Sequence, residues 1–169
     1  MQKQLLIYTG RQEQSIGNTN MPSDLIFCSP TSEDLWNQMM DLRFEVLRKP
    51  WGEPKGSEQA DDDEKSIHGI IVNHENQVIG TCRCHLNSEN EAQFRFMAID
   101  AKFQGKGLGK LLVQYMENLI KETYPGVNKI ILHSREPAVP FYLAMNYKIV
   151  STSYMLFGVI PHFLMEKSF

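Results

Sequence analysis

The stretch that most constrains this chain is Phe94 to Ile120, which joins an apolar strand, a glycine-rich bend and an amphipathic helix without interruption. Glycines stand at alternate positions of the bend, at Gly105, Gly107 and Gly109. Glycine adopts backbone conformations that other residues avoid, and it has no side chain to hold a ligand away. A helix start also offers unpaired N–H groups and the positive end of the helix dipole, so the bend predicts a site for phosphate oxygens.

The segment after the bend repeats apolar residues at the three-and-four spacing of one buried helix face. The members of this face are Leu108, Leu111, Leu112, Tyr115, Met116, Leu119 and Ile120. Because this face packs inward, only the loop end of the helix is left for a ligand. Lys106 and Lys110 add positive charge there, so residues 104–110 are the predicted phosphate site. The alternative is a glycine-rich turn that only starts a helix.

Two common phosphate-binding motifs do not fit the bend. A Walker A loop needs Gly where Gln104 stands and Ser or Thr where Leu111 stands, so its magnesium ligand is missing. A dinucleotide fingerprint needs G-x-G-x-x-G, whereas the sequence reads G-K-G-L-G, with no acidic residue ending a second strand at the expected distance. A nucleotide triphosphate binder is therefore a weak alternative.

Composition excludes several classes of protein. The 169 residues, 42% of them hydrophobic and 22% charged, suit one globular domain. A net charge of -3 without a basic run argues against a nucleic-acid partner. No apolar run approaches the ~20 residues of a membrane span and no signal peptide is evident, so we expect no membrane and a cytoplasmic location.

The cysteine content is consistent with the expected cytoplasmic location. Their odd number, three, suits a reducing compartment better than a disulfide framework. Cys82 and Cys84 form a C-x-C pair without a matching second pair, so we expect buried apolar side chains and no metal.

In chain order, residues 1–23 read as a polar N-terminal extension with a short apolar patch at residues 5–8, and residues 24–169 as a single domain. A strand over residues 24–29 precedes a helix from about Ser32 to Leu47, and a long loop then runs to Ser66. Its acidic run, residues 61–64, is either a solvated face, which we favour, or an attractor for an amine substrate.

Strands follow the loop as an antiparallel meander that delivers the central strand to the glycine bend. After the amphipathic helix, residues 129–133 form a strand that should lie parallel to the central one, by the right-handed crossover rule. Asp100 and His133 would then stand at neighbouring strand ends. A short helix from about Pro137 to Met145 and two final strands complete the chain.

The bend resembles the acetyl-CoA loop of the GNAT superfamily of N-acetyltransferases. The family pattern Q/R-x-x-G-x-G/A is matched by Gln104, Gly107 and Gly109. A later segment, F-Y-x-x-x-N-Y over residues 141–147, resembles the family signature F/L-Y-x-x-x-G-F/Y, with Asn146 in the place of Gly. Apart from Gly, Asn is the residue that most readily adopts the left-handed conformation at the end of a helix, so this exchange is tolerable. Residues 42–52 and 158–167 further resemble the ElaA-like branch of predicted acyltransferases.

The resemblance implies an α+β (α/β) GNAT-like fold: a mixed, mostly antiparallel central sheet that splays at two parallel strands and is flanked by helices. It implies acetyl-CoA as acyl donor, no metal, and transfer of the acetyl group to a primary amine of a small molecule or peptide. The alternative is a non-catalytic acetyl-CoA sensor or interaction module. Exposed terminal strands would also allow a homodimer.

The site residues follow from the matched motifs. Those expected to bind the cofactor are Met97, Ala98, Ile99, Gln104, Gly105, Lys106, Gly107, Leu108, Gly109, Lys110, Arg135 and Tyr142. Arg135 replaces the family's usual Asn, and an arginine there could bind a CoA phosphate.

Two of the site residues are candidates for proton transfer. Tyr142 is the expected general acid, because a phenol with a pKa of about 10 is protonated at neutral pH. His133 is the candidate base. Arg43 and Arg48 are candidate contacts to the acceptor, with surface or capping roles as the alternative.

Overall fold

The structure is a computed structural model that describes residues 8–9 and 25–169. The strands are β1 (Tyr8–Thr9), β2 (Ile26–Cys28), β3 (Ile67–Val72), β4 (Val78–Leu86), β5 (Glu91–Ile99), β6 (Lys129–Arg135), β7 (Lys148–Leu156) and β8 (Ile160–Ser168). The α-helices are α1 (Glu33–Leu47), α2 (Leu108–Thr123) and α3 (Val139–Leu143), and the 3₁₀ helices are η1 (Lys49–Trp51), η2 (Asp63–Lys65), η3 (Ala101–Phe103) and η4 (Glu136–Ala138).

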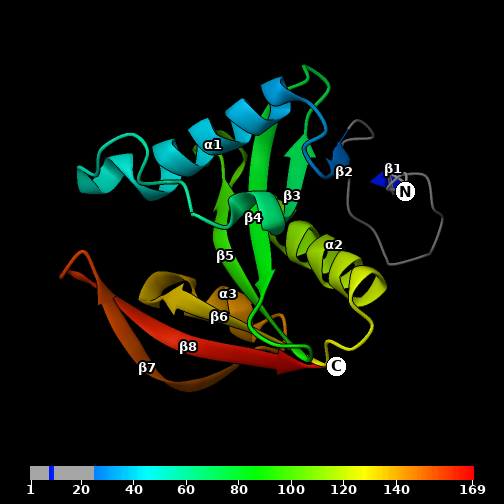
Figure 1. Ribbon diagram of the computed structural model, residues 1–169. Coiled ribbons are helices and arrows are strands. Elements are labelled where there is room, and N and C mark those ends of the chain that lie inside the picture. The colour runs from blue at the N-terminus through cyan, green and yellow to red at the C-terminus, as the bar shows by residue number, and fades with distance from the viewer. Residues whose placement is uncertain (1–7, 10–24) are drawn as a thin grey trace.

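The described strands form one sheet in the order β1-β2-β3-β4-β5-β6-β8-β7. Neighbouring strands are antiparallel, except that β5 and β6 run parallel. The parallel pairing covers only Glu91–Phe94 of β5 against Lys129–Leu132 of β6. Beyond it, β5 stays beside β4 while β6 stays beside β8, so the sheet splays into two halves (Figure 1). The predicted mixed sheet that splays at two parallel strands is confirmed.

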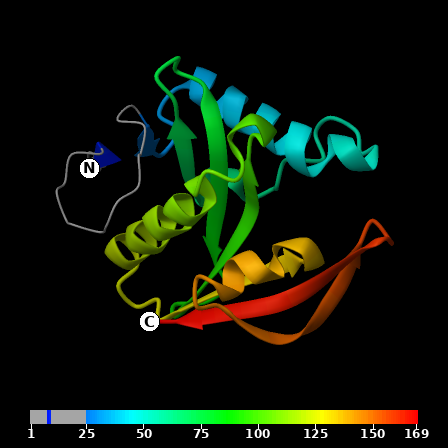
Figure 2. The same cartoon turned by 180° about the vertical axis from the view of Figure 1, so that it is seen from behind.

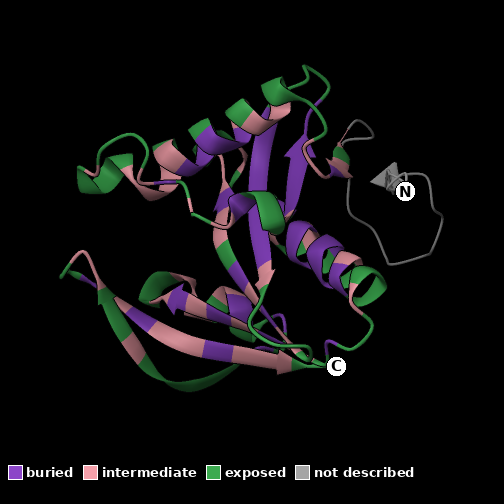
Figure 3. Ribbon diagram, in the orientation of Figure 1, coloured by how far each residue is buried: buried purple, intermediate pink, exposed green. Residues whose placement is uncertain are grey.

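The helices α1 and α2 cover opposite faces of the first half of the sheet. α1 packs on Ile70, Val72 and Val78, whereas α2 packs on the other face against β3, β4 and β5 (Figures 1 and 2). α3 packs against β6 and β7 of the second half and shares the larger apolar core with α2. Burial is concentrated on β3, β4 and the inner side of α2, while β7 is largely exposed (Figure 3).

The helix boundaries follow local sequence signals. Ser32 caps α1, because its hydroxyl accepts a hydrogen bond from the Leu35 amide (3.2 Å). The third predicted helix is shorter than expected, because the segment begins as η4 and α3 spans only Val139–Leu143. Asn146 has a φ of 67°, the left-handed conformation expected at this position.

Near the N-terminus, β1 pairs with β2 and so extends the sheet by one short strand. The rest of the apolar patch predicted there, residues 5–7, lies outside the described residues. In the described part of the chain, no helix combines the length and the apolar character that crossing a membrane requires. The three cysteines, Cys28, Cys82 and Cys84, are free and buried, as expected.

Candidate active site

A cleft of about 670 Å³ opens where β5 and β6 separate. The glycine loop and the start of α2 form one part of its wall, and the end of α1 forms another. The exposed parts of β5 and β6, with α3 and β7, complete it. The splay therefore joins the predicted phosphate site to Tyr142 and to the face of the sheet beside α1.

The glycine loop presents unpaired amides at the start of α2. Gly105 and Gly107 have φ angles of 74° and 79°, and no atom lies within 4 Å of the position that a Cβ would take on either. Within the described part of the chain, the amides of residues 104–110 donate no hydrogen bond. This geometry suits the oxygens of a phosphate group. Phosphate binding itself stays a prediction.

The other two residues of the loop motif have packing roles. The side chain of Gln104 donates a hydrogen bond from Nε2 to the carbonyl of Ile99 (2.9 Å), which ties the loop to the end of β5. Gly109 lies against the ring of Phe141, which is 3.4 Å from the position of a Cβ. Gly109 thus lets α3 approach α2 closely.

The edge of β5 that faces the cleft is free of β6. The amide of Asp100 donates to the carbonyl of Ile79 on β4 (2.9 Å). Hydrogen-bonding groups of successive strand residues point to opposite edges, so those of Ile99 and Met97 point into the cleft. The backbone of Ala98 points to β4, where Ala98 pairs with Thr81. We therefore expect backbone contacts to an acyl donor from Met97 and Ile99, and only a side-chain contact from Ala98.

A bulge in β5 shapes the middle of the cleft. The register between β4 and β5 shifts between Thr81 and Arg83, and on β5 Phe96 has a φ of 51°. An aromatic residue in this conformation stores about 1–3 kcal/mol of backbone strain. The Phe96 ring lies under three guanidinium groups, those of Arg43 (4.7 Å), Arg48 (5.2 Å) and Arg95 (5.3 Å). The bulge changes the direction of β5 in the part of the cleft that Arg48 and Arg95 line.

Tyr142 lies on α3 in the wall of the cleft. Its ring packs edge-on against Phe141 (4.9 Å between centroids) and Tyr147 (5.6 Å). Burial raises the pKa of Tyr142 above its ordinary value, so the phenol is protonated at neutral pH. Its hydroxyl makes no hydrogen bond to another described residue. The phenol is thus available to donate a proton.

His133 lies on β6 and faces the α1 side of the sheet. Its Nδ1 is 2.6 Å from the hydroxyl of Ser153, and its ring lies 5.1 Å from that of Tyr154. Burial, and then the charges of His162 and Arg95, lower the pKa of His133, so the imidazole is neutral at pH 7. The expected neighbour Asp100 is wrong, because β5 and β6 separate before the strand ends and the register sets His133 level with Arg95.

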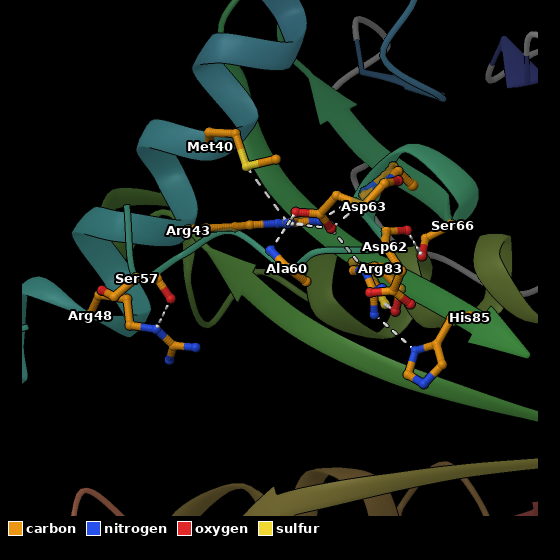
Figure 4. Close-up of polar contacts among 12 residues, drawn as sticks. Met40, Arg43, Arg48, Ser57, Ala60, Asp62, Asp63, Ser66, Arg83 and His85 are labelled. Atoms are coloured by element: carbon orange, nitrogen blue, oxygen red, sulfur yellow. Dashed lines mark hydrogen bonds and ion pairs between the residues drawn. The ribbon is translucent and has the colours of Figure 1, made fainter. Parts of the chain in front are cut away.

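Arg43 does not contact the cleft, which corrects the expectation that it binds the acceptor. Its side chain is fully buried under α1, where Nη1 lies 3.2 Å from both carboxylate oxygens of Asp63 and Nη2 lies 2.8 Å from Nδ1 of His68 (Figure 4). Burial lowers the pKa of Arg43, and the charge of Asp63 opposes this shift. Arg43 therefore fastens the loop after η1 to the body of the domain.

Two residues of the acidic run on that loop, Asp62 and Asp63, belong to the same cluster (Figure 4). Nε of Arg83, another fully buried residue, lies 2.9 Å from Asp63 Oδ1, and the Arg83 guanidinium also pairs with Asp62. The interpretation of a solvated face is wrong for Asp63, which is buried as the counterion of both arginines, but it holds for Asp61 and Glu64, which are exposed. Asp62 is half exposed, and Arg83 holds it as well as Asp63. These two carboxylates are also not free to attract an amine.

Arg48 and Arg135 line the cleft on its α1 side. Arg48 donates to the carbonyls of Ser57 (2.8 Å) and Leu47 (3.3 Å). Arg135 donates to the carbonyl of Leu47 (3.3 Å) and lies over the ring of Trp51 (5.6 Å). These contacts hold the Arg135 guanidinium at the end of α1, and its expected role as a CoA phosphate ligand stays a prediction.

The cleft residues that the sequence interpretation missed include Arg95, Phe96, Tyr154 and His162. The alternation of β5 could have placed Arg95 on the α1 side, because Phe94 is a core residue of the opposite face. No sequence signal marks a bulge at an aromatic residue. Tyr154 and His162 depend on the curl of β7 and β8 towards α1, which local patterns do not encode.

A sheet split at two parallel strands, with a glycine loop of unpaired amides on one side and a buried tyrosine between, is an arrangement that suits a CoA-dependent acyltransferase. The sequence profile of the acetyltransferase (GNAT) family matches residues 36–147. The chain belongs to this family and is a GNAT-family N-acetyltransferase.

Known proteins agree with this assignment. A Bacillus subtilis (strain 168) protein, BSU40680, whose name assigns it provisionally to the acetyltransferases, is 30% identical over 136 residues, covering 77% of this chain and 90% of the relative. The crystal structure of Escherichia coli ElaA superimposes with a TM-score of 0.72 at 15% identity, covering 86% of this chain and 99% of ElaA. That of an aminoglycoside 6'-N-acetyltransferase with coenzyme A gives 0.70 at 17% identity, covering 84% and 96%. At these identities the two structures support the fold.

Proposed function

We propose that this enzyme transfers the acetyl group of acetyl-CoA to a primary amine by direct attack within a ternary complex. The observation that carries the proposal is the continuous cleft from the unpaired amides of the glycine loop, along the free edge of β5, to the hydroxyl of Tyr142. We assign the activity to residues 24–169, with residues 1–23 as an extension. Acetyl-CoA would supply the acyl group as a thioester with the CoA thiolate as leaving group.

Each part of the cleft has a role in this proposal. The amides of residues 104–110, with Lys106 and Lys110, would hold the pyrophosphate. The backbone groups of Met97 and Ile99 would pair with the amides of the pantetheine arm as an added strand does. A backbone N–H of β5 would stabilise negative charge on the thioester oxygen.

Proton transfer falls to two side chains of the cleft. The Tyr142 hydroxyl would donate a proton to the leaving sulfur, because burial keeps it protonated. His133, neutral at pH 7, is the candidate to accept a proton from the amine.

The cysteines support direct attack over a covalent acyl-enzyme. None of the three lies in the cleft, and all are buried. Burial raises the pKa of Cys82, and it raises the pKa of Cys84 to about 12, so neither is a thiolate at neutral pH. Their reduced state also leads us to propose a cytoplasmic location. A homodimer through the exposed edge strand β7 stays a prediction.

Transfer of labelled acetyl groups from acetyl-CoA to a panel of amines tests the proposal. The ternary-complex route predicts intersecting initial-rate patterns, whereas an acyl-enzyme predicts parallel ones. Acetyl-CoA binding with no transfer to any amine would instead favour the alternative, a non-catalytic sensor.

The role of Tyr142 has a test of its own. Tyr142→Phe keeps the buried ring and removes the proton donor, so we expect kcat to fall by about 10²–10⁴-fold with acetyl-CoA affinity unchanged. Full turnover of this variant would remove Tyr142 as the general acid. Tyr154→Phe is the control, because it removes a tyrosine hydroxyl from another part of the cleft wall, and we expect it to lower kcat less than Tyr142→Phe does.

A further inference from the structure

Three arginines line the α1 side of the cleft without a carboxylate partner. Arg48, Arg95 and Arg135 each contribute to the wall. Among the described residues, no Asp or Glu oxygen lies within 4.0 Å of their guanidinium nitrogens. The other two described arginines, Arg43 and Arg83, both pair with Asp63. The chain therefore pairs its two buried arginines with a carboxylate, whereas those of the cleft have none at ion-pair distance, and Glu53 and Glu58 act on Arg48 only from farther away.

The three groups lie near one another and are held in place by neutral partners. The charge of Arg95, after burial, lowers the pKa of Arg48, and the charge of Arg48, after burial, lowers the pKa of Arg135. Arg48 and Arg135 both donate to the carbonyl of Leu47, and Arg48 and Arg95 both lie over the ring of Phe96. Carbonyls and ring faces orient a guanidinium but leave its charge uncompensated.

The rest of the cleft wall adds no negative side chain. Its described lining contains His133 and His162 but no Asp or Glu. The proposed phosphate site has cations of its own, because Lys110 lines the cleft there and Lys106 lies on the same loop. The arginines are therefore in excess of what the acyl donor requires, and they face the side from which the acceptor enters. We call the surface formed by Arg48, Arg95, Arg135, His133, His162 and Tyr154 the arginine groove.

We propose that the acceptor is a primary amine that also carries an anionic group, a carboxylate or a phosphate, and that the arginine groove binds this group. The inference rests on the proposed acetyl transfer. A planar guanidinium forms paired hydrogen bonds with either anion, so the groove matches both chemistries. The positive field of the groove also disfavours an ammonium ion, which favours the neutral amine required for attack. Polycationic amines should be poor acceptors despite the structural likeness to an aminoglycoside acetyltransferase.

Matched acceptors test the anion directly. The panel consists of ω-amino acids with two to six carbons, their uncharged amides, and diamines of the same lengths, with aminoalkyl phosphates against aminoalcohols as a second arm. We expect kcat/KM for the best anionic acceptor to exceed that of its neutral partner by about 10- to 100-fold, the range for a hydrogen bond to a charged group. We expect the diamines to be the poorest. The two arms show whether carboxylate or phosphate is bound.

Arg95→Gln links the preference to the groove. The Arg95 side chain makes no hydrogen bond to another described residue, so its replacement should leave stability within ~0.5 kcal/mol. We expect KM for the anionic acceptor to rise about 10-fold or more with kcat and the KM of the neutral partner little changed, and Arg95→Lys to recover part of the loss. The control is Lys148→Gln, which removes the same charge from an exposed residue outside the cleft.

The outcomes separate this inference from the proposed function. Equal turnover of anionic, neutral and cationic amines would overturn the inference and leave acetyl transfer intact. A loss of acetyl-CoA affinity in Arg95→Gln would also overturn it, because the groove would then serve the donor. If no amine is acetylated, calorimetric titration of the CoA-saturated enzyme with the same panel decides: tighter binding of the anionic amines supports the groove, and equal or absent binding refutes it.

Discussion

Asp63 is the residue whose loss the structure makes most costly outside the cleft. Its carboxylate is the contact shared by Arg43 and Arg83, and both arginines have no solvent exposure. It also accepts a hydrogen bond from the Ala60 amide (2.9 Å). In Asp63→Asn the shape is kept, but Arg43 loses its only described carboxylate partner and Arg83 keeps only the half-exposed Asp62.

Removing one partner of a buried ion pair leaves an uncompensated buried charge and costs about 3–5 kcal/mol. Total stability of a domain is about 5–15 kcal/mol, so this is a large fraction of it. In a domain of this size each kcal/mol shifts Tm by about 2–4 °C, so we expect Asp63→Asn to melt about 6–20 °C below the wild type. Urea unfolding followed by circular dichroism gives the free energy, and calorimetry gives Tm.

Two further variants make the reasoning refutable. Asp61→Asn removes a charge from the same loop at an exposed position without a described ion pair, and should change stability by less than ~1 kcal/mol. Asp63→Asn combined with Arg43→Met removes the stranded charge and should recover part of the loss. An Asp63→Asn protein within 1 kcal/mol of wild type, or a double variant less stable than the single, would show that the buried arginines do not depend on this carboxylate.

Two other predictions concern the glycine loop and the buried His68. Gly107→Val places a side chain where φ is 79°, so it should strain the glycine loop by about 1–2 kcal/mol even though no atom opposes the new side chain. We expect calorimetry to show acetyl-CoA binding that is weaker by roughly tenfold. The control is Gly56→Val, at a φ of 101° outside the cleft, which should strain its own loop without changing that affinity. Burial lowers the pKa of His68 from 6.5 to about 4, so the unfolded chain takes up the proton first as pH falls. The contribution of His68 to the free energy of unfolding should therefore be constant above pH 6.5, decline by up to about 3 kcal/mol towards pH 4 and then level off. Urea unfolding at a series of pH values should show a shallower decline for His68→Gln, and an unchanged slope would contradict this assignment.

Much of the donor side could be predicted from the sequence because its signals are local. The glycine spacing defines where the backbone turns left-handed, and α2 follows from apolar periodicity. The Asn146 conformation follows from turn chemistry in the same way. Each of these features depends on residues within a few positions of one another, so one sequence suffices to predict it.

The acceptor side depends on contacts between distant segments. Whether Arg43 meets the acceptor or Asp63 is decided by how the loop folds back under α1, and the contact of Arg135 with Leu47 is decided by the direction in which β6 leaves β5. A charged side chain in sequence shows its need for a partner but not which partner is near. The sequence by itself determined the family, the order of the elements and the position of the glycine loop. Only the tertiary structure decided which arginines pair with a carboxylate and which three line the cleft without one, because charge pairing depends on register and burial.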